Sequence, residues 1–269
     1  MSKQRRLIGL VLGAVLMGSS PAHADGLDDI KARGTLIVGT KGDYRPFGFR
    51  DGSGAIVGFE PDLAADVARK LGVKLELTPV VTPDRIRLLT EHKLDVVIAT
   101  MNATDERRKL IDFVEPSYYA SGVNVLAPKS LHLHVWQELR GKPVCTVEGS
   151  FYISEIRDRY DAVIQTFNNT SAMYPALRDN KCVAVVYDDT AIIGQLQSPD
   201  WQDYEMPLLS ILVEPWGMGV AKGETRLEAA LSDAVREWHR SGRIQELEKR
   251  WNIPPSAFAD EMHRKYLGE

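Results

Sequence analysis

The hydrophobic pattern in the first half of the chain alternates between strand-like and helix-like stretches. Short apolar runs bounded by turn residues are typical of buried strands, and apolar residues spaced three and four apart are typical of helices. The expected strands are 35–40, 74–80 and 94–100, and the expected helices are 60–71 and 85–91. This β-α-β-α-β order predicts a mainly parallel sheet covered by helices.

A second α/β unit follows, and the chain then returns to helices that need a sheet to cover. The expected strands of this unit are 143–147, 162–166 and 183–187, its helices are 151–160, 171–178 and 190–197, extended stretches lie at 121–127 and 216–221, and the final helices lie within 227–251. If the final helices cover the first sheet, the chain crosses twice between lobes. The predicted fold class is an α/β two-lobe clamshell, with two hinge crossings and a cleft at the carboxyl ends of the strands. We assign 25–122 and 218–269 to a discontinuous first lobe, and 123–217 to the second.

The first 24 residues have the pattern of a secretory signal peptide. Lys3, Arg5 and Arg6 precede an apolar run at 7–17 that is too short to span a bilayer. Residues 22–24, Ala-His-Ala, supply the small residues of a cleavage point. We expect cleavage there and a mature chain that works in the periplasm. An uncleaved membrane anchor is the alternative.

Composition and charge narrow the range of partners. The net charge is −4, and removal of the leader, which has three basic residues and no acidic one, takes it to −7. An acidic chain without a basic stretch is a poor candidate for binding nucleic acid or an anionic membrane surface. No later apolar run has the length of a membrane span. We therefore expect a monomer that neither binds nucleic acid nor inserts into a membrane.

Cys145 and Cys182 are the only cysteines, and both lie in the expected mature chain. In an oxidising compartment an even pair is a candidate disulfide. The bond would close a loop of about 38 residues and add roughly 3–4 kcal/mol of stability by its effect on chain entropy. Two buried thiols are the alternative.

Several motifs occur in order along the mature chain. They are 39–47 (GTKGDYRPF), 57–63 (VGFEPDL), 95–101 (DVVIATM), 104–109 (TDERRK), 112–119 (DFVEPSYY), 141–144 (GKPV) and 187–189 (YDD). Together they resemble the family 3 extracellular solute-binding proteins, over essentially the whole mature chain. The resemblance implies a periplasmic protein that delivers polar amino acids to the membrane permease of an ABC importer.

A free amino acid needs a cation for its α-carboxylate and an anion for its α-ammonium group. Arg107 offers a planar guanidinium that can make two parallel hydrogen bonds to a carboxylate. Asp188 directly follows the apolar strand 183–187, whose carboxyl end faces the expected cleft. The resemblance implies ligand contacts at both positions. The alternatives are a salt bridge from Arg107 to Asp112 or Glu115, and a helix-capping role for Asp188.

The resemblance implies further contacts from the first lobe. Tyr44 would be an aromatic platform over the ligand, and Phe59 would form a second apolar wall unless it belongs to the core. Thr100 and Asn102 would present backbone and polar side-chain groups. Asn102 replaces the Ser or Thr usual in the family, and still offers donors and an acceptor.

The second lobe would add Ser150 and the backbone N–H groups that open the next helix, which could hold the carboxylate. Phe151 stands where the family usually has a hydroxyl residue. It keeps the N–H but loses the hydroxyl, so part of the anion site would differ from the family pattern.

Lys41 and Arg85 bear on which amino acid is bound. By the resemblance, members that bind cationic ligands carry an acid in the loop of Lys41, which argues against arginine, lysine and histidine as ligands. Residues 84–89 resemble a segment of acidic-amino-acid binders, in which the arginine reaches the ligand's side-chain carboxylate. Glutamate or aspartate is therefore the first expected ligand. An ion pair between Arg85 and a surface acid is the alternative.

A binding protein is expected rather than an enzyme. No nucleophile elbow or P-loop occurs, and no cofactor or metal is expected, because the close pair His132 and His134 lacks a third ligand. The family includes a few periplasmic dehydratases that act on cyclohexadienyl substrates, and this chain has Ala191 where their catalytic glutamate aligns. Glu148, beside the cleft, keeps the enzyme alternative open.

Overall fold

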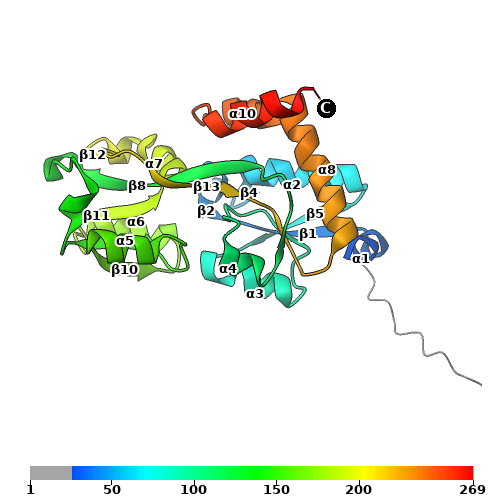
Figure 1. The fold of residues 1–269 in the computed structure, drawn as a ribbon, viewed down its shortest axis with the longest axis horizontal. Helices are drawn as coiled ribbons and strands as arrows, with labels where there is room; N and C mark the ends of the chain where they lie inside the picture. The colour runs from blue at the N-terminus through cyan, green and yellow to red at the C-terminus, as the bar shows by residue number, and fades with distance from the viewer. Residues whose placement is uncertain (1–25, 269) are drawn as a thin grey trace, which may run out of the picture.

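The chain folds into two α/β lobes that lie side by side, each built around its own sheet (Figure 1). The computed structural model describes residues 26–268, so the predicted signal peptide at 1–24 lies outside the described residues. The first part of the chain and the last helices form the larger lobe, and the middle of the chain forms the smaller lobe. The predicted two-lobe α/β fold is confirmed.

The larger lobe has a five-stranded sheet with β1 between β5 and β6. The strand order is β5 (Lys74–Pro79), β1 (Thr35–Thr40), β6 (Val96–Val97), β14 (Gly219–Val220) and β7 (Asp112–Phe113). β1 pairs in parallel with both neighbours, whereas β14 is antiparallel to β6 and β7. A small antiparallel sheet follows β1 and consists of β2 (Asp43–Tyr44), β3 (Gly48–Arg50) and β4 (Ile56–Val57).

Helices from both ends of the chain pack on the larger lobe. They are α1 (Gly26–Arg33), α2 (Phe59–Leu71), η1 (Thr82–Asp84), α3 (Arg85–Thr90), α4 (Asp105–Arg108), α8 (Thr225–Ser241), α9 (Arg243–Arg250) and α10 (Ala257–Tyr266). The apolar stripe of α8 is buried at Leu231 and Val235, and α8 contacts α1 and α2. The chain therefore returns to the first lobe, as its final apolar stripe predicts.

The smaller lobe has a six-stranded sheet in which β9 and β11 are central. Its strands are β10 (Val163–Phe167), β9 (Pro143–Val147), β11 (Ala184–Asp188), β8 (Tyr119–Pro128) and β12 (Tyr204–Glu205) in that order, with β13 (Ile211–Trp216) also paired to β8. Its helices are η2 (Lys129–Leu131), η3 (Trp136–Leu139), α5 (Ile153–Tyr160), α6 (Thr170–Arg178), α7 (Asp189–Leu196) and η4 (Pro199–Trp201). β9 is parallel to β10 and β11, and β8 is antiparallel to β11.

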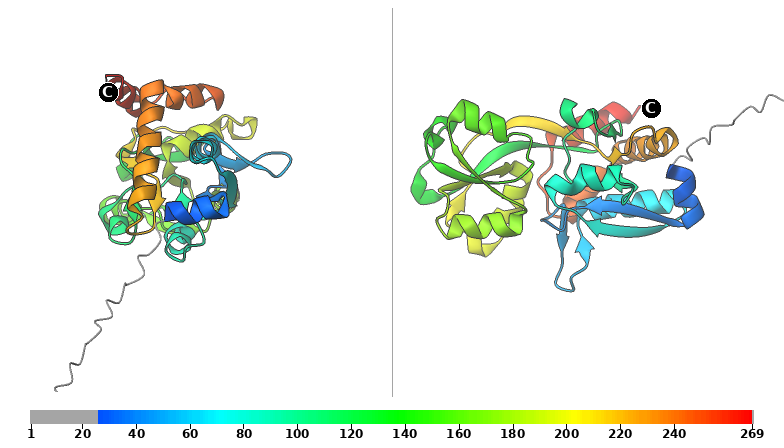
Figure 2. Two further views of the ribbon diagram at one scale, coloured as in Figure 1. Left: turned by 90° about the vertical axis from the view of Figure 1, so that its right-hand side faces the viewer. Right: turned by 90° about the horizontal axis from the view of Figure 1, so that it is seen from below.

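Two antiparallel segments, β8 and β13, join the lobes (Figures 1 and 2). Trp216 pairs with Tyr119 and Glu214 pairs with Ser121, so the two crossings support each other. β14 follows β13 and enters the sheet of the larger lobe. The predicted lobe boundaries fall within β8, after residue 122, and between β13 and β14, after residue 217.

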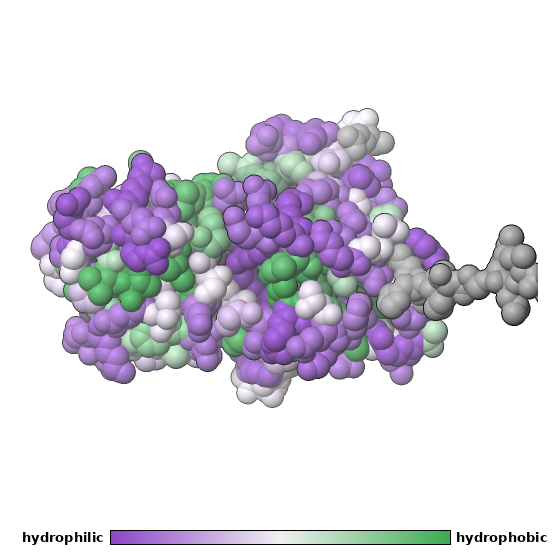
Figure 3. All heavy atoms as spheres, turned by 60° about the horizontal axis from the view of Figure 1, so that its bottom comes forward, coloured by the Kyte–Doolittle hydropathy of each residue, from purple (hydrophilic) through white to green (hydrophobic). Residues whose placement is uncertain are grey.

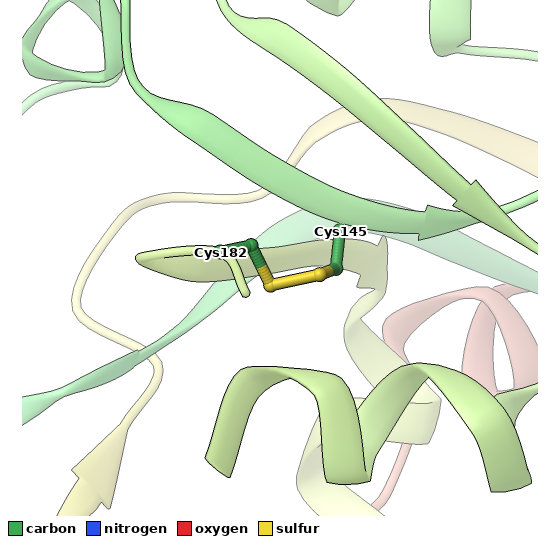
Figure 4. The surroundings of a disulfide bond; sticks show 2 residues. All are labelled: Cys145 and Cys182. Atoms are coloured by element: carbon green, nitrogen blue, oxygen red, sulfur yellow. A yellow bond between two sulfur atoms is a disulfide. The ribbon is translucent and has the colours of Figure 1, made fainter. Parts of the chain in front are cut away.

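The predicted disulfide is confirmed (Figure 4). Cys145 lies in β9, Cys182 lies just before β11, and their Cα atoms are 5.7 Å apart. Both cysteines are buried, and the two strands are hydrogen-bonded neighbours. The bond therefore ties together the two strands whose ends carry residues of the cleft.

Figure 3 shows a face on which hydrophilic residues predominate and hydrophobic residues form separate areas. Among residues 26–268, no helix has the length and apolar character needed to cross a membrane.

Candidate functional site

Segments that follow the parallel strands of both sheets meet between the lobes and enclose a small cavity. Its lining residues are Thr82, Arg85, Thr100, Asn102 and Arg107 from the larger lobe, and Ser150, Phe151, Tyr152, Tyr187 and Asp188 from the smaller lobe. The cavity contains about 240 Å³ of empty space. The centre of a water molecule can occupy only about 10 Å³ of that space. That is room for roughly one water. The lobes are therefore closed over the cavity and must separate to admit an amino acid.

Arg107 reaches the cavity from the first turn of α4. Thr104 caps this helix by accepting a hydrogen bond from the backbone N of Arg107 at 3.4 Å, as its residue type predicts. The guanidinium donates from Nη1 to the carbonyl of Asn102 at 3.0 Å and from Nη2 to the carbonyl of Gly149 at 3.1 Å. Gly149 belongs to the smaller lobe, so Arg107 spans the closed cleft.

The charge of Arg107 has no anionic partner. Asp112 pairs with Lys222 and Glu115 pairs with Arg108, so the predicted alternative salt bridges do not form. Among residues 26–268, no carboxylate forms an ion pair with Arg107. Burial, and then the nearby charge of Arg85, lower the pKa of Arg107 to about 9. Because a guanidinium stays protonated in proteins, this shift indicates a cation that an incoming anion would stabilise.

Asp188 contributes a buried acidic group from the smaller lobe. It occupies the cap position of α7, but its side chain makes no capping hydrogen bond, so the capping alternative does not hold. Its Oδ2 accepts a hydrogen bond from the Tyr44 hydroxyl at 3.0 Å. Burial raises the pKa of Asp188 to about 7, against the lowering effect of that hydrogen bond. An incoming cation would stabilise the ionised carboxylate.

Two aromatic residues expected at the ligand lie outside the cavity lining. Tyr44 is buried, and its hydroxyl crosses the lobe interface to Asp188 and to Thr190 Oγ1 at 2.7 Å. Phe59 is fully buried in the aromatic core, with its ring centroid 5.2 Å from that of Phe47. Phe59 is thus a core residue, which is the alternative that the sequence left open.

The aromatic lining comes instead from Phe151, Tyr152 and Tyr187 of the smaller lobe. The Tyr152 hydroxyl donates to the carbonyl of Val186 at 3.2 Å. Sequence reasoning missed Tyr152, Tyr187 and Thr82. The sequence offered a signal for the two tyrosines, because each is next to a residue that was expected at the ligand. Tyr152 follows Phe151, and Tyr187 precedes Asp188 at the end of β11.

Arg85 lines the cavity but directs its guanidinium mainly to backbone carbonyls. Nη1 donates to Ala99 at 2.6 Å and to Thr100 at 3.1 Å, and Nε donates to Thr82 at 3.1 Å. Arg85 is only 3% exposed, and no salt bridge to a surface acid forms within the described residues.

Lys41 does not line the cavity. Its side chain is fully buried, and Nζ lies 3.1 Å from Oδ1 of Asp43. Asp43 Oδ2 in turn accepts hydrogen bonds from the smaller lobe, from Thr170 N at 2.8 Å and from Thr170 Oγ1 at 3.0 Å. Lys41 therefore supports a contact between the lobes, and its Nζ also donates a hydrogen bond to Thr82 Oγ1 of the cavity lining at 3.5 Å.

The remaining chemical candidates lie apart from the cavity. Glu148 is exposed and Ala191 is buried in α7. Across residues 26–268, no group of three or more His, Cys, Asp or Glu side chains is placed to hold a metal ion.

Comparisons with known proteins agree with this architecture. A family model described as bacterial extracellular solute-binding proteins, family 3, matches residues 36–254. The L-cystine-binding protein TcyJ of Escherichia coli K12 is 30% identical over 259 residues, which is 92% of this chain and 95% of that protein. A mutant of the arginine-binding protein ArgBP from T. maritima superposes with a TM-score of 0.79 at 30% identity, over 85% of this chain and 99% of that one. An ancestral amino acid-binding protein described as a precursor of cyclohexadienyl dehydratase superposes with a TM-score of 0.76 at 28% identity, over 85% and 99% of the two chains.

Proposed function

Because this chain belongs to the family 3 bacterial extracellular solute-binding proteins, we propose that it binds a free amino acid in the periplasm and delivers it to the permease of an ABC importer. The observation that carries the proposal is the pair of uncompensated charges across the cavity. Arg107 has no carboxylate partner among the described residues, and burial keeps Asp188 from ionising readily. A zwitterion would satisfy both groups at once.

Binding would proceed by docking and closure. The α-carboxylate docks on Arg107 and on the polar groups of Thr100 and Asn102 in the larger lobe. The smaller lobe then brings Ser150 toward the carboxylate and Asp188 toward the ammonium group. Closure is a population shift, driven by contacts that the ligand makes only when both lobes meet it. The permease would recognise the closed form.

Glutamate and aspartate are the first proposed ligands. Arg85 contributes a second guanidinium to the lining, and among residues 26–268 its Nη2 has no hydrogen-bond partner. That N–H group is available for a side-chain carboxylate. L-Cystine is the second candidate, supported by the name of the E. coli relative and by the aromatic lining, since sulfur packs favourably against rings.

A thermal-shift screen of residues 25–269 against the twenty amino acids, L-cystine and related derivatives tests the proposal. A ligand at about 100 times its Kd adds roughly 2.7 kcal/mol of stability. A shift confined to glutamate and aspartate supports the proposed specificity, and a shift with another amino acid retains the transport role alone. If none of them shifts the melting temperature, the amino-acid proposal fails. Turnover of a cyclohexadienyl substrate would then favour the enzyme alternative.

Arg107→Ala tests the site itself. Loss of a buried partner for the carboxylate should cost about 2–5 kcal/mol of binding free energy. Arg108→Ala is the matched control, because this neighbour is exposed and pairs with Glu115. Equal affinity of Arg107→Ala and wild type would show that the assigned site is wrong.

A further inference from the structure

The wall of the cavity contains a backbone conformation that its residue type disfavours. Thr100 has a φ of +48° and is only 5% exposed. A β-branched residue with positive φ is a genuine outlier, because its side chain crowds the backbone. Such a conformation persists only where surrounding contacts hold it. The conformation of Thr100 also sets the path of the chain to Asn102, whose carbonyl accepts a hydrogen bond from Arg107.

Two buried charged side chains hold the peptide groups on either side of this residue. Glu60 Oε1 accepts a hydrogen bond from Thr100 N at 2.6 Å. Arg85 Nη1 donates to the carbonyls of Thr100 and Ala99 at 3.1 and 2.6 Å. Glu60 is 0% exposed and Arg85 is 3% exposed, so both contacts are shielded from water. Burial raises the pKa of Glu60 to about 7, and in its ionised form its hydrogen bond to Thr100 is charge-assisted, which makes it about twice as strong as a neutral one.

Glu60 is itself fixed in place. It lies in the first turn of α2, and its backbone N donates to the carbonyl of Phe47 at 2.9 Å. Its Oε1 also accepts a hydrogen bond from the Tyr118 hydroxyl at 2.5 Å, and Oε2 has no partner within the described residues. Glu60 does not line the cavity. A carboxylate in so enclosed a place needs a role that offsets its cost of burial.

We propose that Glu60 is a positioning residue for the ligand site: it holds Thr100 in the left-handed conformation that directs the chain toward Asn102 and Arg107. Arg85 supports the same turn from its carbonyl side. The inference rests on the proposed function, and adds to it a residue that no ligand touches. It also gives Arg85 a second role, as a support of the wall as well as part of the lining.

The test uses Glu60→Gln in the mature protein, with Asp62→Asn as matched control. Glutamine keeps the shape but offers Thr100 N an acceptor without charge. The control makes the same change from carboxylate to amide in the same turn of α2, at a side chain that accepts a hydrogen bond from Trp251 Nε1 at 2.8 Å. The first readout needs no ligand: the amide resonance of Thr100 in protein labelled with ¹⁵N-threonine. We expect it to move upfield in Glu60→Gln and to stay near its wild-type position in Asp62→Asn.

The second readout is affinity for L-glutamate, L-aspartate, L-cystine and L-arginine by calorimetry. We expect Glu60→Gln to weaken the binding of whichever of these binds wild type by about 10-fold, and Asp62→Asn to change it less than about 2-fold. A cycle with Thr100→Gly separates positioning from general stability. Glycine adopts positive φ without strain, so in that background Glu60→Gln should cost less than about 3-fold.

Each outcome decides the inference. An unmoved Thr100 amide in Glu60→Gln overturns it. So does a loss of affinity that is equally large in the Thr100→Gly background, because the effect would then not pass through the backbone at this residue. If wild type binds no amino acid in the thermal-shift screen, the proposed function fails, and the amide resonance alone decides whether Glu60 holds Thr100.

Discussion

Gly194 is the position where a single added methyl group should keep the lobes apart. It lies in α7 of the smaller lobe and faces the loop after β2 in the larger lobe. A Cβ at this position would sit 2.3 Å from the carbonyl oxygen of Arg45 and 2.9 Å from Cδ of Pro46. The first contact is with backbone, which cannot swing aside as a side chain does. The Gly194→Ala variant must therefore separate the lobes by a fraction of the methyl's diameter or strain the loop.

The added methyl group destabilises the closed form alone. Overpacking by one methyl typically costs about 1–3 kcal/mol. In the open form the alanine meets no opposing lobe, and it favours the helix by roughly 0.5–1 kcal/mol relative to glycine. Closure should therefore become less favourable by about 1–3 kcal/mol, which weakens ligand binding by about 5- to 150-fold.

The assay is calorimetric titration with the amino acid that gives the largest thermal shift. X-ray scattering with that amino acid at saturation reports the extent of closure. Gly52→Ala is the control, because a Cβ there meets nothing within 4 Å. We expect Gly194→Ala to bind more weakly, to melt no lower than wild type without ligand, and to close less completely. Affinity equal to that of wild type would refute the argument that this contact forms on closure.

Three further predictions follow from the contacts between and within the lobes. Because burial holds the pKa of Asp188 at about 7 and a ligand ammonium needs the carboxylate ionised, affinity should fall as the pH drops below 7 and stay level above it; titrations from pH 5 to 8 should show this dependence, and it should be weaker in Asp188→Asn, where Glu60, whose pKa burial also raises to about 7, still titrates. Thr170→Val removes the hydroxyl that donates to Asp43 Oδ2 across the lobes, and calorimetry should show affinity reduced about 5-fold, for roughly 1 kcal/mol of hydrogen bonding; unchanged affinity would mean that this contact is absent in the bound state. The double replacement of Cys145 and Cys182 by alanine should lower the free energy of unfolding in urea by roughly 3–4 kcal/mol and leave affinity within about 2-fold, since neither cysteine lines the cavity.

The fold was predictable where the hydrophobic pattern is dense. β1, β9 and β11 coincide with the expected strands within one residue, because each is a continuous apolar run in a parallel sheet. The predicted strand at 94–100 is an exception: β6 has only Val96–Val97, because the chain leaves the ladder and turns at Thr100. The pattern contains no signal for positive φ at a threonine.

Elements held by tertiary contacts alone were missed. The strands β2, β3 and β4 have two or three residues each, too short for a period to be visible. α10 has just two buried residues, Ala259 and Tyr266, so its apolar face is narrow. Neither the small sheet nor α10 could be inferred from periodicity, because both depend on what they pack against.

The chemical types of the site were predictable, and the partners of each group were not. The sequence places a guanidinium after one strand and a carboxylate at the end of another, and the family resemblance was needed to single out Arg107 and Asp188 as expected ligand contacts. It cannot show whether Arg107 pairs with Asp112 or Glu115, because that depends on where Lys222 and Arg108 lie in space. For Lys41 the sequence shows the nearby partner but not the role of the pair. Its partner Asp43 is two residues away in sequence, yet the role of that pair depends on a residue of the other lobe.

Each lobe contributes one of the charged groups of the site, and this arrangement explains why closure needs a ligand. Without one, closure buries Arg107 near Arg85 on one side and Asp188 on the other, with about one water's space between them. Each charge then loses solvation without gaining a direct ion pair, which opposes closure. Some contacts that favour closure lie outside the cavity, at Asp43 and Gly194. A zwitterion reverses the balance inside the cavity. Variants of the outer contacts should therefore weaken all ligands by the same factor, whereas variants of the lining should change the order in which ligands are preferred.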